Sequence, residues 1–173
     1  GRMELRDETM AGNVEWIDDR STGPVVLWGH NGHFRRGSHV LEEWDVDVPS
    51  MGEWLDDAYG DDYCPVAFDL GGGTVAATDG EVGELVDYEI PEPPSGSIPD
   101  VLRAVDEPLC CLSVAELHDD PTVSEWLRSE PERHNIWGGH PDGDHPVNYR
   151  PSDLTEFDWL LFVRDTEAMV PLE

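Results

Sequence analysis

The spacing of apolar residues divides the chain into helical and extended segments. Between residues 3 and 19, apolar side chains recur every three or four positions, which predicts an amphipathic helix. Shorter helices are predicted at residues 51–59, with Ser50 as N-cap and Gly60 at the end, and at residues 97–105 and 123–129. Apolar and β-branched runs predict strands at residues 25–28, 63–70, 74–78, 85–90, 109–114 and 157–163.

The order of these segments predicts an α/β fold. Helices alternate with strands, which favours crossover connections, so we expect a mainly parallel sheet flanked by helices. Turn residues at 71–73 and 79–80 indicate a β-hairpin rather than a phosphate cradle, because no Gly-Lys-Ser/Thr follows the three glycines. Residues 38–50 and 130–152 are expected to be irregular, the second as a long polar loop. We find no linker that divides the 173 residues, so a single domain over 1–173 is expected.

The charge of the chain excludes several classes of partner. Asp and Glu number 39 against 10 basic residues, all of them arginine, which gives a formal net charge of -29. Such a surface does not attract nucleic acid or an anionic membrane. Like charges would repel at low salt and are screened at molar salt. We therefore expect the chain to come from an extreme halophile.

The cysteines and the absence of an apolar leader suit a cytoplasmic protein. The three cysteines, Cys64, Cys110 and Cys111, form no disulfide framework, so they are expected to be buried and reduced. No stretch of the sequence is long and apolar enough to span a bilayer.

Two histidines form the leading candidate site. His30 and His33 follow the apolar run at 25–28, with Asn31 between them. Ligands of α/β sheets collect at the carboxyl ends of strands, and a histidine can act as a base at neutral pH. The pair could serve catalysis or ligand binding, or could be a hydrogen-bonded structural pair. Zinc proteases place two histidines four residues apart on a helix with a glutamate between them, and His30 and His33 do not follow this pattern. We therefore expect no metal or cofactor.

Arg35 and Arg36 come directly after the histidines in a chain that is poor in basic residues. They could bind a carboxylate or phosphate of a substrate, or orient a neighbouring carboxylate through a bidentate pair. The alternative is a local ion pair with Glu42 and Glu43.

A second group of histidines lies between residues 134 and 145. His134, His140 and His145 occur there with Asp142 and Asp144, a set that could clamp a divalent cation. The loose spacing and the overall acidity favour a solvated loop instead.

Several motifs together resemble the erythromycin esterase family in their order and spacing. Residues 6–13 read Arg-Asp-Glu-Thr-Met-Ala-Gly-Asn, and residues 30–33 read His-Asn-Gly-His after an apolar run. Residues 51–55 read Met-Gly-Glu-Trp-Leu, and residues 59–63 read Tyr-Gly-Asp-Asp-Tyr. The segments 68–77 and 157–162 also fit, so the resemblance covers most of the chain.

This resemblance implies hydrolysis of a carboxylic ester or lactone on an α/β fold, with His30 and His33 in the active cleft. Family members are about twice as long, and their first half carries another histidine, thought to activate the water. The chain therefore resembles the C-terminal half of such a protein, without the N-terminal catalytic half, and is expected to be inactive in isolation.

Two classes of function remain open. The first is an ester hydrolase that acts on a small-molecule substrate. The second is a non-catalytic binding or assembly module that keeps only half of a site and buries its exposed apolar surface by self-association or against the N-terminal half. A metal-dependent hydrolase that uses His30 and His33 with distant carboxylates is a weaker third hypothesis.

Overall fold

The computed structural model describes residues 2–41, 46–79, 83–136, 139–140 and 146–170. The chain forms two compact units. Unit 1 consists of residues 1–67 and 155–159, and unit 2 consists of residues 68–154 and 160–173. The expectation of a single domain over 1–173 stays a prediction.

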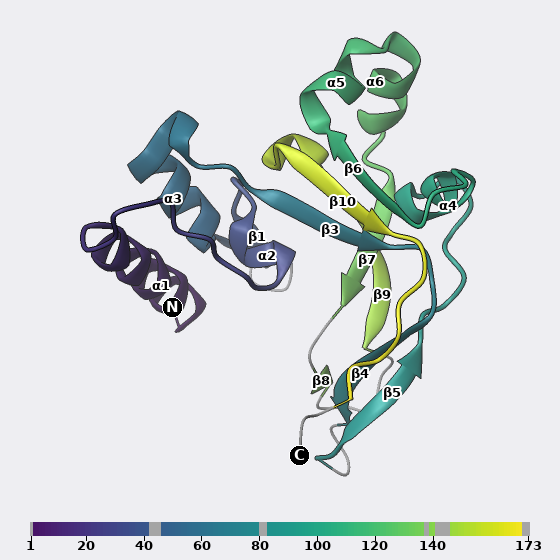
Figure 1. Ribbon diagram of the computed structural model, residues 1–173, viewed down its shortest axis with the longest axis horizontal. Helices are drawn as coiled ribbons and strands as arrows, with labels where there is room; N and C mark the ends of the chain where they lie inside the picture. Colours follow the sequence, from purple (N-terminus) through teal and green to yellow (C-terminus); the bar gives the residue numbers. More distant parts are fainter. Residues whose placement is uncertain (1, 42–45, 80–82, 137–138, 141–145, 171–173) are drawn as a thin grey trace. The chain divides into compact units, whose positions relative to one another are not determined.

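Unit 1 is built on two helices that lie side by side, α1 (Arg2–Asp18) and α3 (Met51–Tyr59) (Figure 1). Their buried residues form one core, to which Leu27 and Phe34 add partly buried side chains. The core residues are Ala11, Val14, Met51 and Leu55. Both helices were predicted, and the caps of α3 are confirmed, since Ser50 Oγ accepts the Glu53 N–H at 3.1 Å and Gly60 is the C-cap.

The predicted buried strand at residues 25–28 is wrong. These residues belong to no strand, and Val26 (90% exposed) and Trp28 (80% exposed) point away from the core while Leu27 packs on it. The alternation is that of an extended chain with one side on the core. Because an apolar run cannot show whether a partner strand is present, the sequence pattern could not make this distinction.

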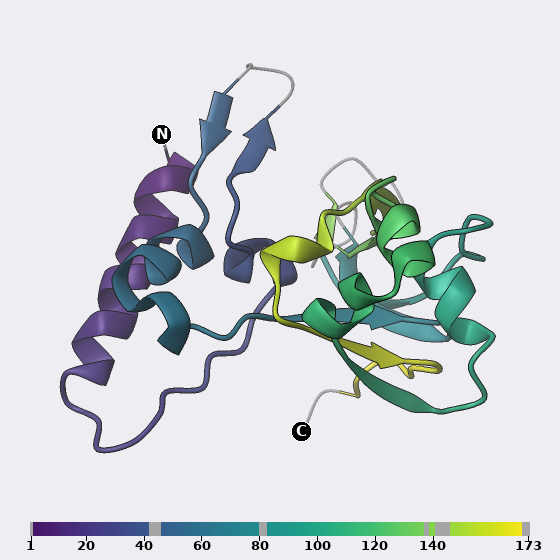
Figure 2. The same ribbon diagram turned by 90° about the horizontal axis from the view of Figure 1, so that it is seen from above.

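The expected irregular segment at 38–50 contains a two-stranded antiparallel ribbon instead, β1 (His39–Leu41) and β2 (Val46–Val48). Figure 2 shows this ribbon beside α1. Between the apolar run and the ribbon lies the one-turn helix α2 (Asn31–Phe34). In the part of the chain that the structure describes, 3-10 turns occur at η2 (Gly60–Asp62) and η3 (Leu154–Glu156).

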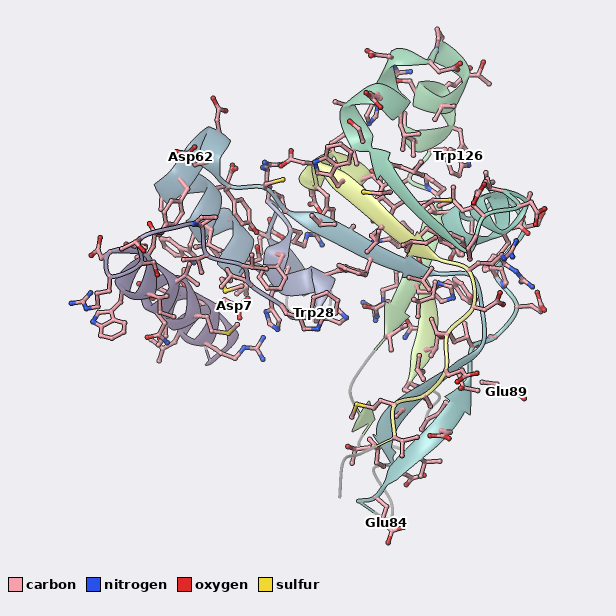
Figure 3. All side chains as sticks on the ribbon, viewed as in Figure 1. Asp7, Trp28, Asp62, Glu84, Glu89 and Trp126 are labelled. Atoms are coloured by element: carbon pink, nitrogen blue, oxygen red, sulfur yellow. The ribbon has the colours of Figure 1, made fainter. Side chains whose placement is uncertain are left out.

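Unit 2 contains most of the strands. One sheet has the order β3-β10-β6, a second has the order β5-β4-β8, and a third pairs β7 with β9. The strands are β3 (Val66–Leu70), β4 (Thr74–Asp79), β5 (Leu85–Glu89), β6 (Leu109–Ser113), β7 (Glu132–Ile136), β8 (Gly139–His140), β9 (Val147–Pro151) and β10 (Trp159–Val163). The helices are α4 (Ile98–Arg103), α5 (Val114–Asp119) and α6 (Pro121–Leu127), the last bearing Trp126 (Figure 3).

The fold is a mixed α/β structure, and a mainly parallel sheet is not confirmed. The pairs β1–β2, β4–β5 and β7–β9 are antiparallel, and β4–β8 is parallel. The predicted polar loop at 130–152 contains β7, β8 and β9. Its ladder was missed because Arg133, His134 and Asn148 are polar residues within strands, and polarity alone predicted a loop.

At the glycine-rich segment 71–73, two segments of the chain approach each other closely. Gly73 has φ of 102°, and a Cβ built there would lie 2.0 Å from the carbonyl oxygen of Thr166. Only glycine fits both requirements.

The thiols are more accessible than expected. Cys64 and Cys111 are exposed and Cys110 is partly buried, all three as free thiols. Among the described residues, no helix has the length and apolar character needed to cross a membrane.

Candidate functional site

Asp7 lies at the centre of the candidate site in unit 1 (Figure 3). Its side chain is only 1% exposed. Oδ1 accepts a hydrogen bond from Arg6 Nε at 3.1 Å. Oδ2 accepts from His33 Nδ1 at 3.0 Å, His39 Nε2 at 3.3 Å and the backbone N–H of Met51 at 3.2 Å. Donors from α1, α2, β1 and α3 thus converge on one buried carboxylate.

The burial of Asp7 follows from its position on α1. Asp7, Ala11 and Val14 are spaced by four and three residues, so they share the helix face that packs on the core. Burial by itself raises the pKa of Asp7, but the hydrogen bonds from His33 and Arg6 bring that pKa below its ordinary value. Asp7 is therefore a buried, ionised anchor at neutral pH.

The hydrogen bonds of His33 assign its tautomer. Asp7 is ionised and can only accept, so His33 Nδ1 carries the proton and donates. Arginine can only donate, so His33 Nε2 accepts from Arg6 Nη2 at 3.3 Å. These contacts place the proton of His33 on Nδ1 and its lone pair on Nε2, with a carboxylate behind the ring. This is the arrangement of a base that is held in one orientation.

His30 has the opposite tautomer. It is the N-cap of α2, and its Nδ1 accepts the backbone N–H of Gly32 at 3.0 Å. In the neutral ring the proton must then be on Nε2, which makes Nε2 a hydrogen-bond donor. The ring centroids of His30 and His33 lie 6.4 Å apart. The short helix therefore presents a donor and an acceptor close together.

His39 completes the cluster, and the sequence interpretation missed it together with Asp7. The rings of His33 and His39 lie 6.0 Å apart, and burial lowers the pKa of His39 against the opposing effect of Asp7. The signal for Asp7 was present in the sequence, because a carboxylate on the apolar face of a predicted helix needs a partner. No comparable signal identified His39, which depends on the fold of the β1–β2 ribbon.

Arg35 and Arg36 are both paired with carboxylates in unit 1. Arg35 Nη2 forms an ion pair with Glu156 Oε1. Arg36 donates two hydrogen bonds to Asp158, both at 2.9 Å, and one from Nε to Asp56 at 2.8 Å. Its Nη2 also donates to the carbonyl oxygen of Tyr63 at 3.0 Å. Arg36 thus joins α3 and residues 155–159 to the segment that carries the histidines.

Arg36→Met is expected to lower the free energy of unfolding by about 2 kcal/mol, because it leaves two carboxylates without their cation. Asp56 and Asp158 are 39% and 38% exposed, so water partly compensates for the loss. Urea unfolding at fixed KCl measures the change. Arg128→Met is the matched control at an exposed C-cap. Equal stabilities of the two variants would contradict a structural role for Arg36.

Two neighbouring residues of α3 explain why Met-Gly follows the histidine segment. The N–H of Met51 donates to Asp7. A Cβ built on Gly52 would lie 2.3 Å from the carbonyl oxygen of Arg35 and 2.5 Å from the carbonyl carbon of Phe34. Glycine therefore lets the start of α3 contact the backbone that carries the site.

The second histidine group does not form a clamp among the described residues. His134 lies on β7 in unit 2, and its Nδ1 is 2.6 Å from Asp69 Oδ1 with both side chains buried. Residues 141–145 of this group, including Asp142, Asp144 and His145, lie outside the described residues. A cation clamp by this group stays untested.

Comparisons with known sequences give two findings. The family model described as "Erythromycin esterase" matches residues 1–166. "Putative hydrolase YbfO" of Bacillus subtilis (strain 168) is 28% identical over 108 residues, which are 60% of this chain and 24% of that protein. The chain thus spans about a quarter of the curated relative that it matches.

Three solved structures share the fold. A Bacillus cereus protein has a TM-score of 0.75 at 17% identity, and a succinoglycan biosynthesis protein has 0.72 at 20% identity. Each match covers 95% of this chain and 39% of the other chain. A mutant of the erythromycin esterase EreC in its open conformation has a TM-score of 0.61 at 17% identity, with 94% and 37% covered.

Proposed function

Because this chain belongs to the erythromycin esterase family, we propose that it carries a proton-transfer site for the hydrolysis of a carboxylic ester or lactone. The supporting observation is the pair of opposite tautomers. His33 has an acceptor lone pair on Nε2, whereas the bond that His30 Nδ1 accepts from Gly32 leaves the His30 proton on Nε2. Ester hydrolysis needs both groups, one to take a proton from water and one to hold the charge that develops on the carbonyl oxygen.

In the proposed reaction, the oxygen of a water attacks the carbonyl carbon while His33 Nε2 takes its proton. Asp7 stabilises the resulting imidazolium through Nδ1–H. His30 Nε2–H donates to the carbonyl oxygen, which becomes an oxyanion. When the intermediate collapses, the C–O bond to the alcohol breaks and the imidazolium returns its proton to the leaving alkoxide.

Arg6 occupies the position next to His33 Nε2 that the water needs. Its side chain is 51% exposed, and Oδ1 of Asp7 holds its Nε. Because the guanidinium is planar, its Nη nitrogens leave His33 Nε2 only when the whole half-exposed side chain turns towards solvent, where it can face the negative charge of the tetrahedral intermediate. We assign Arg6 to this electrostatic role, and Asn31, Arg35 and Arg36 to binding or orienting roles around the site.

The substrate class rests on the family alone. The chain spans 37–39% of the solved chains that it matches, and the family resemblance implies a further histidine outside it. Esters with good leaving groups need the least help from a further base or acid, because water attacks their carbonyl carbon more readily and their alkoxide leaves without protonation. Activated esters are therefore the substrates on which the chain itself is best tested.

The test is hydrolysis of nitrophenyl esters and of a macrolide by this chain in molar KCl. The resemblance implies that the chain is inactive in isolation, whereas the proposed site predicts turnover of the activated esters. We expect a loss of about 10²-fold in His30→Ala, because one donor to the oxyanion is removed. His118→Gln, in which a partly buried histidine of unit 2 is changed, is the matched control and should keep the original turnover. Equal rates for His30→Ala and the control would contradict the assignment of His30.

A second candidate function is a non-catalytic binding or assembly module. It is favoured by apolar side chains on the surface of unit 1, since Leu5 is 65%, Trp16 59%, Val26 90% and Trp28 80% exposed. Such residues can pack against a second copy or against the rest of the family fold. A folded chain that shows no ester turnover and self-associates in sedimentation would favour this function, whereas an active monomer would contradict it.

A further inference from the structure

Three side chains of the site have the chemistry of a transition-metal centre. Asp7 Oδ2, His33 Nδ1 and His39 Nε2 all lie within 4.8 Å of one another. Two imidazoles and one carboxylate are a set that binds Zn²⁺ and related ions. Each ligand comes from a different element, α1, α2 and β1, and Asp7 lies 26 residues before His33 and 32 residues before His39.

The spacing of these atoms suits a metal as well as it suits hydrogen bonds. Ligand atoms of a tetrahedral zinc ion lie about 3.4 Å apart, since each is about 2.1 Å from the metal. Asp7 Oδ2 is 3.0 Å from His33 Nδ1 and 3.3 Å from His39 Nε2. His33 Nδ1 and His39 Nε2 lie within 4.8 Å of each other, so a metal that replaced the two imidazole protons would draw the rings onto itself.

The surroundings of the three ligands support such a centre. The Met51 N–H also donates to the buried carboxylate of Asp7, as outer hydrogen bonds do for metal ligands. The side chains of His33 and His39 are 23% and 17% exposed, so an ion from solvent can reach them. Water can complete the coordination on this exposed side.

We propose that Asp7, His33 and His39 bind one divalent transition-metal ion, with Zn²⁺ as the preferred class, and that this state excludes the hydrogen-bonded one. A metal on His33 Nδ1 requires the proton on Nε2, which then faces the donor Arg6 Nη2. Metal binding thus displaces the half-exposed Arg6 side chain. Metal binding also removes the lone pair on His33 Nε2 that the proposed hydrolysis uses. This consequence rests on the proposed function, whereas the binding of the metal does not.

The test is calorimetric titration with Zn²⁺, and visible absorption with Co²⁺, on the whole chain in molar KCl. Excess Mg²⁺ is present to occupy acidic oxygen sites, because Mg²⁺ prefers oxygen ligands to imidazole. We expect the chain to bind one equivalent of Zn²⁺. We expect the Co²⁺ spectrum to be typical of a four- or five-coordinate ion with nitrogen ligands. Asp7→Asn and His39→Gln should each weaken binding at least about 100-fold, since each removes a ligand.

His118→Gln is the matched control, because it removes one imidazole of unit 2 and leaves the three ligands intact. Circular dichroism shows whether each variant is folded. If Asp7→Asn does not fold, His39→Gln, which changes a partly exposed ring, still tests the proposal. Equal Zn²⁺ affinity in His39→Gln and His118→Gln, or no binding by the unaltered chain, would overturn the proposal. Because the readout is binding, absence of ester turnover leaves this result unaffected, and absence of binding leaves the proposed hydrolysis unaffected.

Discussion

Asp7→Asn is expected to lower the turnover of activated esters by about 10²–10⁴-fold while the chain stays folded. In the unaltered chain, the Asp7 carboxylate accepts a hydrogen bond from His33 Nδ1 at 3.0 Å. An amide at this position can present its NH₂ group to Nδ1, which places the imidazole proton on Nε2. His33 would then keep its place but lose the lone pair that takes a proton from water.

The measurement is initial rates across a range of pH in molar KCl, together with nitrogen NMR shifts of the His33 ring, which report the tautomer. A merely structural role of Asp7 would leave the tautomer of the folded variant unchanged. Asp57→Asn, at an exposed position of α3, is the matched control for the loss of one negative charge. A rate within threefold of this control would contradict the role of Asp7 as a positioning residue.

The double variant with His33→Ala shows whether Asp7 acts through His33. Residues that act as one unit give losses that do not add. We therefore expect His33→Ala to reduce turnover to the same level with or without Asp7→Asn. Additive losses would assign Asp7 an effect that does not pass through the imidazole.

Gly52→Ala is expected to lower the free energy of unfolding by more than about 3 kcal/mol, which makes it the largest effect on stability. The new Cβ would lie 2.3 Å from the Arg35 carbonyl oxygen and 2.5 Å from the Phe34 carbonyl carbon. These are backbone atoms, so no side-chain rotation relieves the overlap. Either α3 or the segment after His33 must move, and ester turnover should fall with stability.

Urea unfolding at fixed KCl tests this prediction. Gly12→Ala is the matched control, because Gly12 lies within α1 and a Cβ there meets no atom within 4 Å. Alanine at that position should raise stability by roughly 0.5–1 kcal/mol through its helix propensity. If both glycine variants changed stability by similar amounts, the close approach at Gly52 would not exist in solution.

The sequence by itself determined the features that depend on neighbouring residues. The helices α1 and α3 follow from apolar spacing, and the caps of α3 follow from the side-chain chemistry of Ser50 and the conformational freedom of Gly60. The strand β10 follows from a continuous apolar run. The family also followed from the sequence, because its motifs occur in order along the chain.

Only the tertiary structure decided the pairing of strands and the partners of the site. An apolar run has the same appearance whether or not a partner strand is present, so residues 25–28 were assigned a ladder that they lack, and the β1–β2 ribbon was missed. Likewise His33 could be recognised as a candidate, but its tautomer depends on Asp7 and Arg6, 26 and 27 residues away. Hydrogen bonds between distant residues require the packed helices that bring them together, and no local pattern contains that geometry.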